Sequence, residues 1–121
     1  MTQIEKQPAK IDEAALHNLV GKMVGDLGAV VSGALVVLGD RLGLYRALAE
    51  IGPADSEKLA RRTGLDERYV REWLANQAAS GYVNYEPKSG CFSMSAEQKA
   101  VFAEPDSPVA MTGGFYAAAS V

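Results

Sequence analysis

Apolar residues recur every three or four positions between residues 12 and 48, the spacing that gathers side chains on one face of an α-helix. The residues that keep this spacing are Leu16, Leu19, Val20, Met23, Val24, Leu27, Val30, Val31, Leu35, Leu38, Leu42 and Tyr45. Asp12 precedes them as a plausible N-cap. The pattern predicts either one helix bent near Gly28 or two helices broken around Gly25–Gly28, with helix continuing over residues 35–50 in both cases.

The pattern changes after Gly52-Pro53, which stops the helical region. The predicted segments are a short helix at 56–62, a turn at 63–66, a longer helix at 67–80 and two short strands at 82–85 and 92–94. Asp66 is placed to cap the longer helix, and Gly81 to end it. Helix, tight turn, helix and hairpin follow one another in a winged helix-turn-helix.

We therefore predict a mainly α-helical fold, a winged helix-turn-helix with a small β-hairpin wing, preceded by long N-terminal helices. Ser95 and Gln98 match a capping box that would begin a further short helix. The last stretch is small and apolar, with Gly113-Gly114 but no C-cap, and looks interrupted within an element. The predicted divisions are a flexible N-terminus at 1–10, a helical dimerisation region at 11–50, the winged helix at 51–108 and the start of a truncated linker helix at 109–121.

Small residues recur at every fourth position in the predicted helical region, at Gly21, Gly25, Ala29 and Gly33. On a helix they would form a strip that lets another backbone approach closely. We hypothesise that this strip is a dimer interface with a second copy of the chain. The alternative is that the glycines only loosen or break the helix, since each costs about 0.8–1 kcal/mol relative to alanine.

Composition narrows the possible functions. The net charge is −3, which counts against a free-standing nucleic-acid binder. The single cysteine, Cys91, cannot form an internal disulfide, and with one histidine, His17, there is no metal-binding cluster. We find no catalytic, cofactor-binding or metal-binding motif. The N-terminus lacks a signal-peptide pattern, and the longest uncharged run, residues 27–39, is short for a membrane span, so we expect a cytoplasmic protein without membrane segments.

The most specific alternative function is DNA binding through the helix at 67–80. Its candidate contact residues are Arg68, Arg71 and Asn76. Between Ser56 and Glu86, however, five basic residues stand against five acidic residues, which leaves no net attraction for a phosphate backbone. We therefore expect a helix-turn-helix used for packing, and DNA as an improbable partner.

Two segments carry a resemblance to a known family. They read Leu38-Gly-Asp-Arg-Leu-Gly-Leu-Tyr-Arg-Ala-Leu-Ala-Glu50 and Leu59-Ala-Arg-Arg-Thr-Gly-Leu-Asp-Glu-Arg-Tyr-Val-Arg-Glu-Trp-Leu74, followed by the wing. The chain resembles the N-terminal winged-helix domain of bacterial class I S-adenosylmethionine-dependent methyltransferases, and is similar to small-molecule O-methyltransferases. The resemblance implies a homodimer, a missing catalytic domain that binds S-adenosylmethionine, and a small-molecule methyl acceptor whose pocket this domain helps to cover.

The resemblance assigns no catalytic or cofactor-binding residue to this chain, because the family places them in the following domain. It suggests that Phe115 and Tyr116, where the chain would lead into that domain, reach toward the pocket. The expected function is thus a non-catalytic dimerisation and pocket-covering domain of a methyltransferase. A free-standing winged-helix transcriptional regulator is the alternative.

Overall fold

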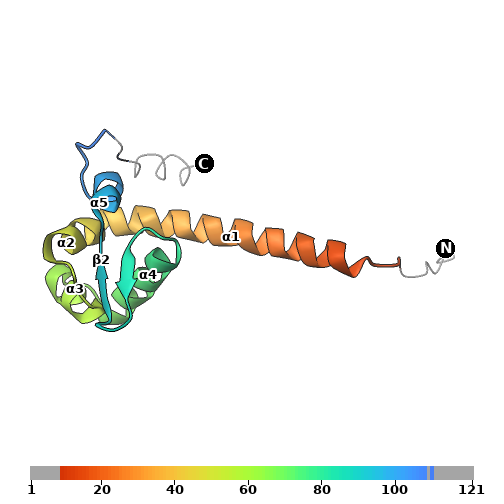
Figure 1. The fold of residues 1–121 in the computed structure, drawn as a ribbon, viewed down its shortest axis with the longest axis horizontal. Helices are drawn as coiled ribbons and strands as arrows, with labels where there is room; N and C mark the ends of the chain where they lie inside the picture. Colours follow the sequence, from red (N-terminus) through yellow and green to blue (C-terminus); the bar gives the residue numbers. More distant parts are fainter. Residues whose placement is uncertain (1–8, 109, 111–121) are drawn as a thin grey trace, which may run out of the picture.

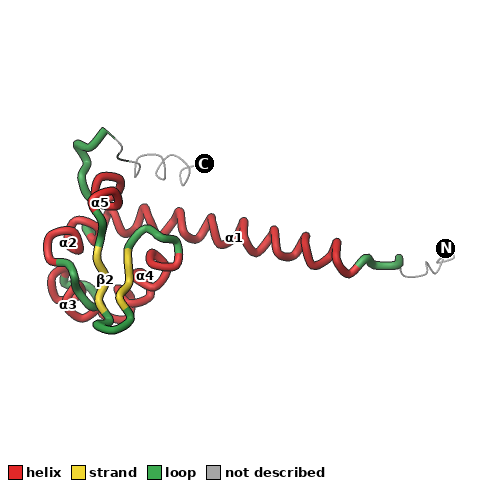
Figure 2. The backbone as a smooth tube through the Cα atoms, viewed as in Figure 1, coloured by secondary structure: helices red, strands yellow, loops and turns green. Residues whose placement is uncertain are grey.

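A computed structural model describes residues 9–108 and 110. Helix α1, Glu13–Arg41, is the longest element, and much of it projects away from the rest of the fold (Figure 1). Asp12 caps it, as predicted, by accepting hydrogen bonds from the backbone N–H groups of Ala14 and Ala15. The helix passes through Gly25–Gly28 without interruption and Figure 2 shows no kink there, so the predicted break or bend is wrong.

The chain changes direction at Leu42 and Gly43 instead, where the prediction had a continuous helix over residues 35–50. Gly43 has φ +73°, a left-handed backbone conformation that residues with a Cβ rarely adopt. Helix α2, Leu44–Ile51, starts after this turn. The turn points the apolar face of α2 into the domain, where Leu44, Tyr45 and Leu48 are buried.

The remaining elements form the predicted winged helix-turn-helix. They are α3 Ser56–Thr63, α4 Glu67–Ala79, β1 Asn84–Glu86, β2 Cys91–Ser93 and α5 Ala96–Phe102. The two strands pair antiparallel with Tyr85 opposite Phe92, and Phe92 also bridges to Ala54 ahead of α3. β1 is one residue shorter than the predicted strand at 82–85, and β2 has the predicted length of three residues. Both strands lie nearer the hairpin turn than predicted, because Val83 and Met94 enter the core rather than the ladder.

Local capping explains why these helices begin and end where they do. The Asp66 side chain accepts from the backbone N–H groups of Arg68 and Tyr69, and Ser95 and Gln98 form the predicted capping box. Gly81 follows α4 with φ +78°, in the left-handed conformation predicted for it. These capping predictions are confirmed.

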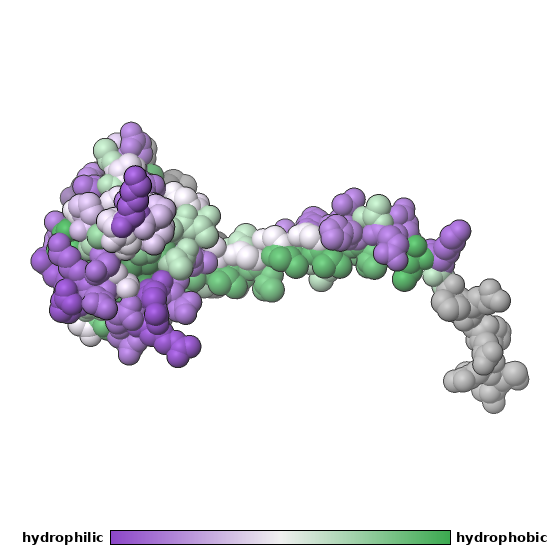
Figure 3. Space-filling view, turned by 60° about the horizontal axis from the view of Figure 1, so that its bottom comes forward, coloured by the Kyte–Doolittle hydropathy of each residue, from purple (hydrophilic) through white to green (hydrophobic). Residues whose placement is uncertain are grey.

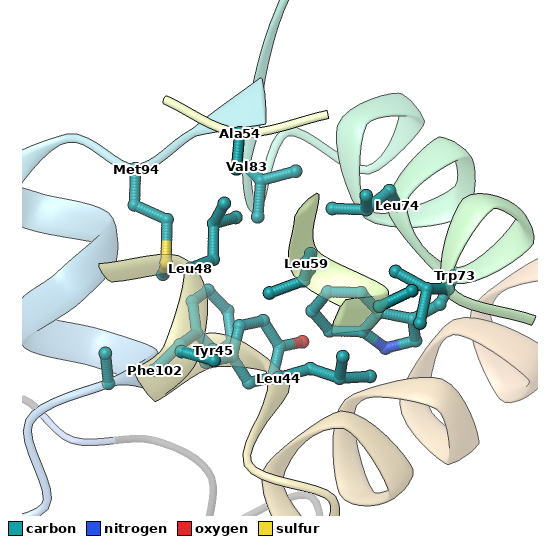
Figure 4. Close-up of a cluster of buried hydrophobic side chains, with 14 of the residues drawn as sticks. Leu44, Tyr45, Leu48, Ala54, Leu59, Trp73, Leu74, Val83, Met94 and Phe102 are labelled. Carbon is teal, nitrogen blue, oxygen red and sulfur yellow. The ribbon is translucent and has the colours of Figure 1, made fainter. Parts of the chain in front are cut away.

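The core lies between the helices and the hairpin (Figure 4). The Tyr45 ring packs edge-on against Trp73 and stacks on Phe102, with ring centroids 4.9 Å apart in both pairs. Its hydroxyl donates to Oε1 of Gln77, a buried polar side chain on α4. Burial raises the pKa of the Tyr45 hydroxyl well above its usual value.

Only the C-terminal part of α1 is packed against this core. The Trp73 indole N–H donates to the carbonyl oxygen of Leu35 over 3.0 Å. Val36 is buried, and Gly39 lies directly against the indole ring. The long helix is therefore anchored to the domain by one end.

Candidate functional site

The most prominent surface feature is an apolar stripe on the free part of α1. Figure 3 shows it as a continuous green band along the helix. We define the apolar stripe as the eight large side chains whose exposed fractions are 46–70%: Leu16, Leu19, Val20, Met23, Val24, Leu27, Val30 and Val31. Isolated exposed apolar side chains are common, but a contiguous set of this size marks an interaction surface.

Helix geometry shows how the stripe is built. At about 100° per residue, the eight side chains fall within an arc of about 140° on one side of α1. Leu38 and Leu42, each 37% exposed, extend the same side to the domain. The apolar spacing in the sequence predicts that these residues share a face. The residues of α1 that are buried are Val36 and Gly39, on the opposite side.

The predicted small-residue interface lies on a different face from the stripe. Gly21, Gly25 and Ala29 are exposed, and Gly33 is half-buried. A Cβ added at Gly21 or Gly25 would meet nothing within 4 Å. The described residues therefore give Gly21 and Gly25 no packing partner, and the function of the four small residues as an interface stays a prediction.

Helix α1 is long and apolar enough to cross a membrane by length and composition. Its polar face, however, carries Lys22 and Asp26, which form an exposed ion pair over 2.6 Å in the middle of the helix. A helix with one apolar and one charged face is amphipathic rather than apolar all round. The expected absence of a membrane segment stays a prediction.

A second candidate surface lies between α4 and the hairpin. It is an open cleft of about 480 Å³. Its lining residues are Ser56, Arg71, Ala75, Ala78, Tyr85, Gly90 and Phe92. The Tyr85 and Phe92 rings contact each other across the two strands, with centroids 4.7 Å apart. The cleft is thus mainly apolar, and Arg71 is the charged residue in its lining.

The three DNA-contact candidates do not form one basic surface. Arg68 and Arg71 are exposed on α4, and the Arg71 Nε lies 3.8 Å from a carboxylate oxygen of Glu67. Asn76 is half-buried, and its side-chain oxygen accepts from the amide of Gln77. The hydrogen bond from Gln77 occupies the side-chain oxygen of Asn76, and Glu67 lies beside Arg71. Both observations weaken the case for a phosphate or base contact. DNA binding stays an untested alternative.

The described residues show no arrangement suited to metal chemistry. Within 9–108 and 110, no three His, Cys, Asp or Glu side chains are placed to hold a metal ion. Phe115, Tyr116 and Gly113-Gly114 lie outside the described residues, as does the predicted linker helix at 109–121 except for residue 110.

Comparison with known proteins identifies the domain. Residues 29–104, more than half of the chain, match the family described as the Rv2258c-like winged HTH domain. The chain belongs to this family. The match runs from the middle of α1 to the end of α5, so the first half of α1, with most of the apolar stripe, precedes it. No curated protein matches the chain.

Solved structures share the fold of this Rv2258c-like domain. The mitomycin 7-O-methyltransferase MmcR is 26% identical, with a TM-score of 0.65 over 81% of this chain and 29% of its own. CalO1, a methyltransferase in calicheamicin biosynthesis in an SAH-bound form, is 23% identical, with a TM-score of 0.66 over 88% of this chain and 29% of its own. A structure of PigF with SAH is 19% identical, with a TM-score of 0.66 over 88% and 28%.

The chain therefore spans less than a third of each of these proteins. The likeness to CalO1 and PigF shows a common fold alone. The winged-helix architecture and the resemblance to a domain found in methyltransferases, both expected from the sequence, are confirmed.

Proposed function

We propose that this Rv2258c-like domain is the non-catalytic N-terminal domain of an S-adenosylmethionine-dependent methyltransferase that acts on a small molecule. The observation that carries the proposal is the match to MmcR, a named O-methyltransferase, at 26% identity over most of this chain and less than a third of that one. A domain that covers so small a share of an enzyme leaves room for a separate catalytic domain. Fold alone would not support this step, because one fold hosts many functions.

In this proposal the chain holds the enzyme's subunits together and does not take part in methyl transfer. S-adenosylmethionine binds to the remainder of the parent enzyme, consistent with the SAH present in the PigF and CalO1 structures. The chain forms a homodimer through α1, and its winged helix covers part of the methyl acceptor's pocket in the cytoplasmic enzyme. The exposed apolar stripe supports the dimer, because an apolar surface of this extent is stabilised by burial.

The second candidate function is a free-standing winged-helix regulator that binds DNA. It is favoured by the exposure of Arg68 and Arg71 on α4, the second helix of the helix-turn-helix. The balance of five basic and five acidic residues between Ser56 and Glu86 disfavours it, since phosphate contacts need an excess of positive charge.

One comparison separates the two functions. The full product of the natural gene and the 121-residue chain are titrated in parallel with S-adenosylmethionine in a calorimeter, and with a duplex DNA at several salt concentrations. We expect the full product to bind S-adenosylmethionine and the chain alone to bind neither ligand. Salt-dependent DNA binding by the chain, together with a natural product that does not bind S-adenosylmethionine, would replace the proposal with the regulator.

A further inference from the structure

We propose that the apolar stripe is covered by the same stripe of a second copy, with the two α1 helices antiparallel and crossing at Leu27. The inference rests on the proposed dimerisation and specifies its face, its orientation and its centre. It differs from the interface predicted from the sequence, because Gly21 and Gly25 lie on the other side of α1.

The size of the stripe matches what a dimer needs. Complete burial of one aliphatic side chain removes about 60–120 Å² of apolar surface from water, and these side chains are roughly half exposed, so eight offer about 250–500 Å². Two copies together would bury about 500–1,000 Å² of apolar surface. Since apolar atoms supply roughly 60% of an interface, the total reaches about 800–1,700 Å², which overlaps the range of specific protein–protein interfaces.

The sequence of α1 is suited to antiparallel self-pairing. Residue 27 is the midpoint of Glu13–Arg41, so in a symmetric antiparallel pair residue i faces residue 54 − i of the second copy. The facing pairs are Leu16 with Leu38, Val20 with Ala34, Met23 with Val31, Val24 with Val30, and Leu27 with itself. Every pair is apolar, and the pairing brings Leu38, exposed at the domain end, under the free end of the second helix.

Charge at the two ends of the stripe favours the same orientation. Glu13 and Arg41 both flank the stripe, at opposite ends of α1, and both are exposed. An antiparallel pair places Glu13 of each copy near Arg41 of the other. A parallel pair would place Glu13 beside Glu13 and Arg41 beside Arg41, and like charges in contact are destabilising. Antiparallel helix dipoles act in the same direction.

The domain of each copy packs against α1 on the side opposite the stripe. Val36 and Gly39 pack against the domain on the side of α1 opposite the stripe. A second helix at the usual distance of about 8–10 Å can therefore lie along the stripe without meeting the Trp73 side of the domain. Each free helix end then reaches the domain of the other copy.

Disulfide trapping tests the face and the orientation together. In a Cys91→Ser background, Leu16→Cys and Leu38→Cys are prepared as separate proteins, mixed, and oxidised at a concentration at which the chain is dimeric. We expect crosslinked dimers in the mixture but not in either protein alone, because a disulfide needs Cβ atoms about 3.5–4.5 Å apart. Asn18→Cys, exposed on the opposite face, is the matched control and should remain uncrosslinked.

Sedimentation equilibrium of Leu27→Asp completes the test, and circular dichroism establishes that this variant is folded. We expect the dissociation constant of the dimer to rise at least tenfold, because the introduced carboxylates of the two copies would face each other at the centre of the interface. Crosslinking of Leu16→Cys with itself would overturn the orientation. If Asn18→Cys crosslinks and Leu27→Asp leaves the dimer as strong as before, the apolar stripe is not the interface. That result would leave the proposed dimerisation intact. A monomeric chain would overturn both, and binding of that monomer to phosphatidylglycerol vesicles would make lipid the occupant.

Discussion

Gly39 is the residue through which α1 approaches the core most closely. A Cβ at this position would lie 2.4 Å from Cζ2 and 2.7 Å from Nε1 of Trp73. Carbon atoms in favourable contact are about 3.5–4.0 Å apart, so Gly39→Ala forces the helix or the indole to move by about 1 Å. The indole has little freedom to do so, because it is buried and its N–H donates to the carbonyl of Leu35.

The expected cost follows from three opposing effects. Overpacking of a well-packed core costs about 1–3 kcal/mol, and loss of the indole hydrogen bond about 1 kcal/mol. Replacement of glycine by alanine within a helix returns about 1 kcal/mol. Gly39→Ala should therefore lower the free energy of unfolding by about 1–3 kcal/mol.

Gly28→Ala is the matched control, because it makes the same substitution in the same helix where a Cβ meets nothing within 4 Å. It should raise the free energy of unfolding by about 1 kcal/mol through helix propensity alone. Urea unfolding of both variants at one chain concentration, followed by fluorescence of the single tryptophan, measures the difference. Equal stabilisation by the two substitutions would refute the close contact between Gly39 and Trp73.

Three further predictions concern the caps and the core. Asp66→Ala should lower the free energy of unfolding by about 1 kcal/mol because α4 loses its N-cap, and Asp66→Asn should retain most of it in the same urea assay. Tyr45→Phe leaves Oε1 of Gln77 buried without its donor and should cost about 1–3 kcal/mol, whereas Tyr85→Phe on the exposed strand should cost little in thermal unfolding. Burial raises the folded-state pKa of Tyr45, so the neutral hydroxyl stabilises the fold below the unfolded pKa of about 10, and this contribution is lost as the pH rises above that value. The free energy of unfolding should therefore fall less steeply at alkaline pH in Tyr45→Phe than in the unchanged protein. An unchanged dependence of the free energy of unfolding on pH would contradict this.

Features set by a few neighbouring residues could be predicted from the sequence. Asp66 and Ser95 act on backbone groups two or three residues away, so their capping functions need no knowledge of the fold. The winged-helix order also follows from such local signals. The turn at Gly43 was missed because the apolar spacing continues through it from Leu42 to Tyr45, and no local signal distinguishes a left-handed glycine from a helical one.

Features that depend on distant contacts could not be predicted. Gly39 is required by Trp73, 34 positions later, and in the sequence it is only one more glycine in a helical region. Periodicity showed that Leu16, Met23 and Leu27 share a face, but not that the described part of the chain leaves this face uncovered. In the proposed dimer, burial of the stripe depends on the second copy, which a single sequence does not describe.

The central claim, that the chain is the N-terminal domain of a methyltransferase, is tested most directly by native mass spectrometry of the protein isolated from its source cells. The account predicts a polypeptide well above the 12.8 kDa of this chain, present as a dimer and carrying S-adenosylmethionine or S-adenosylhomocysteine. A polypeptide of 12.8 kDa that carries neither compound would contradict it.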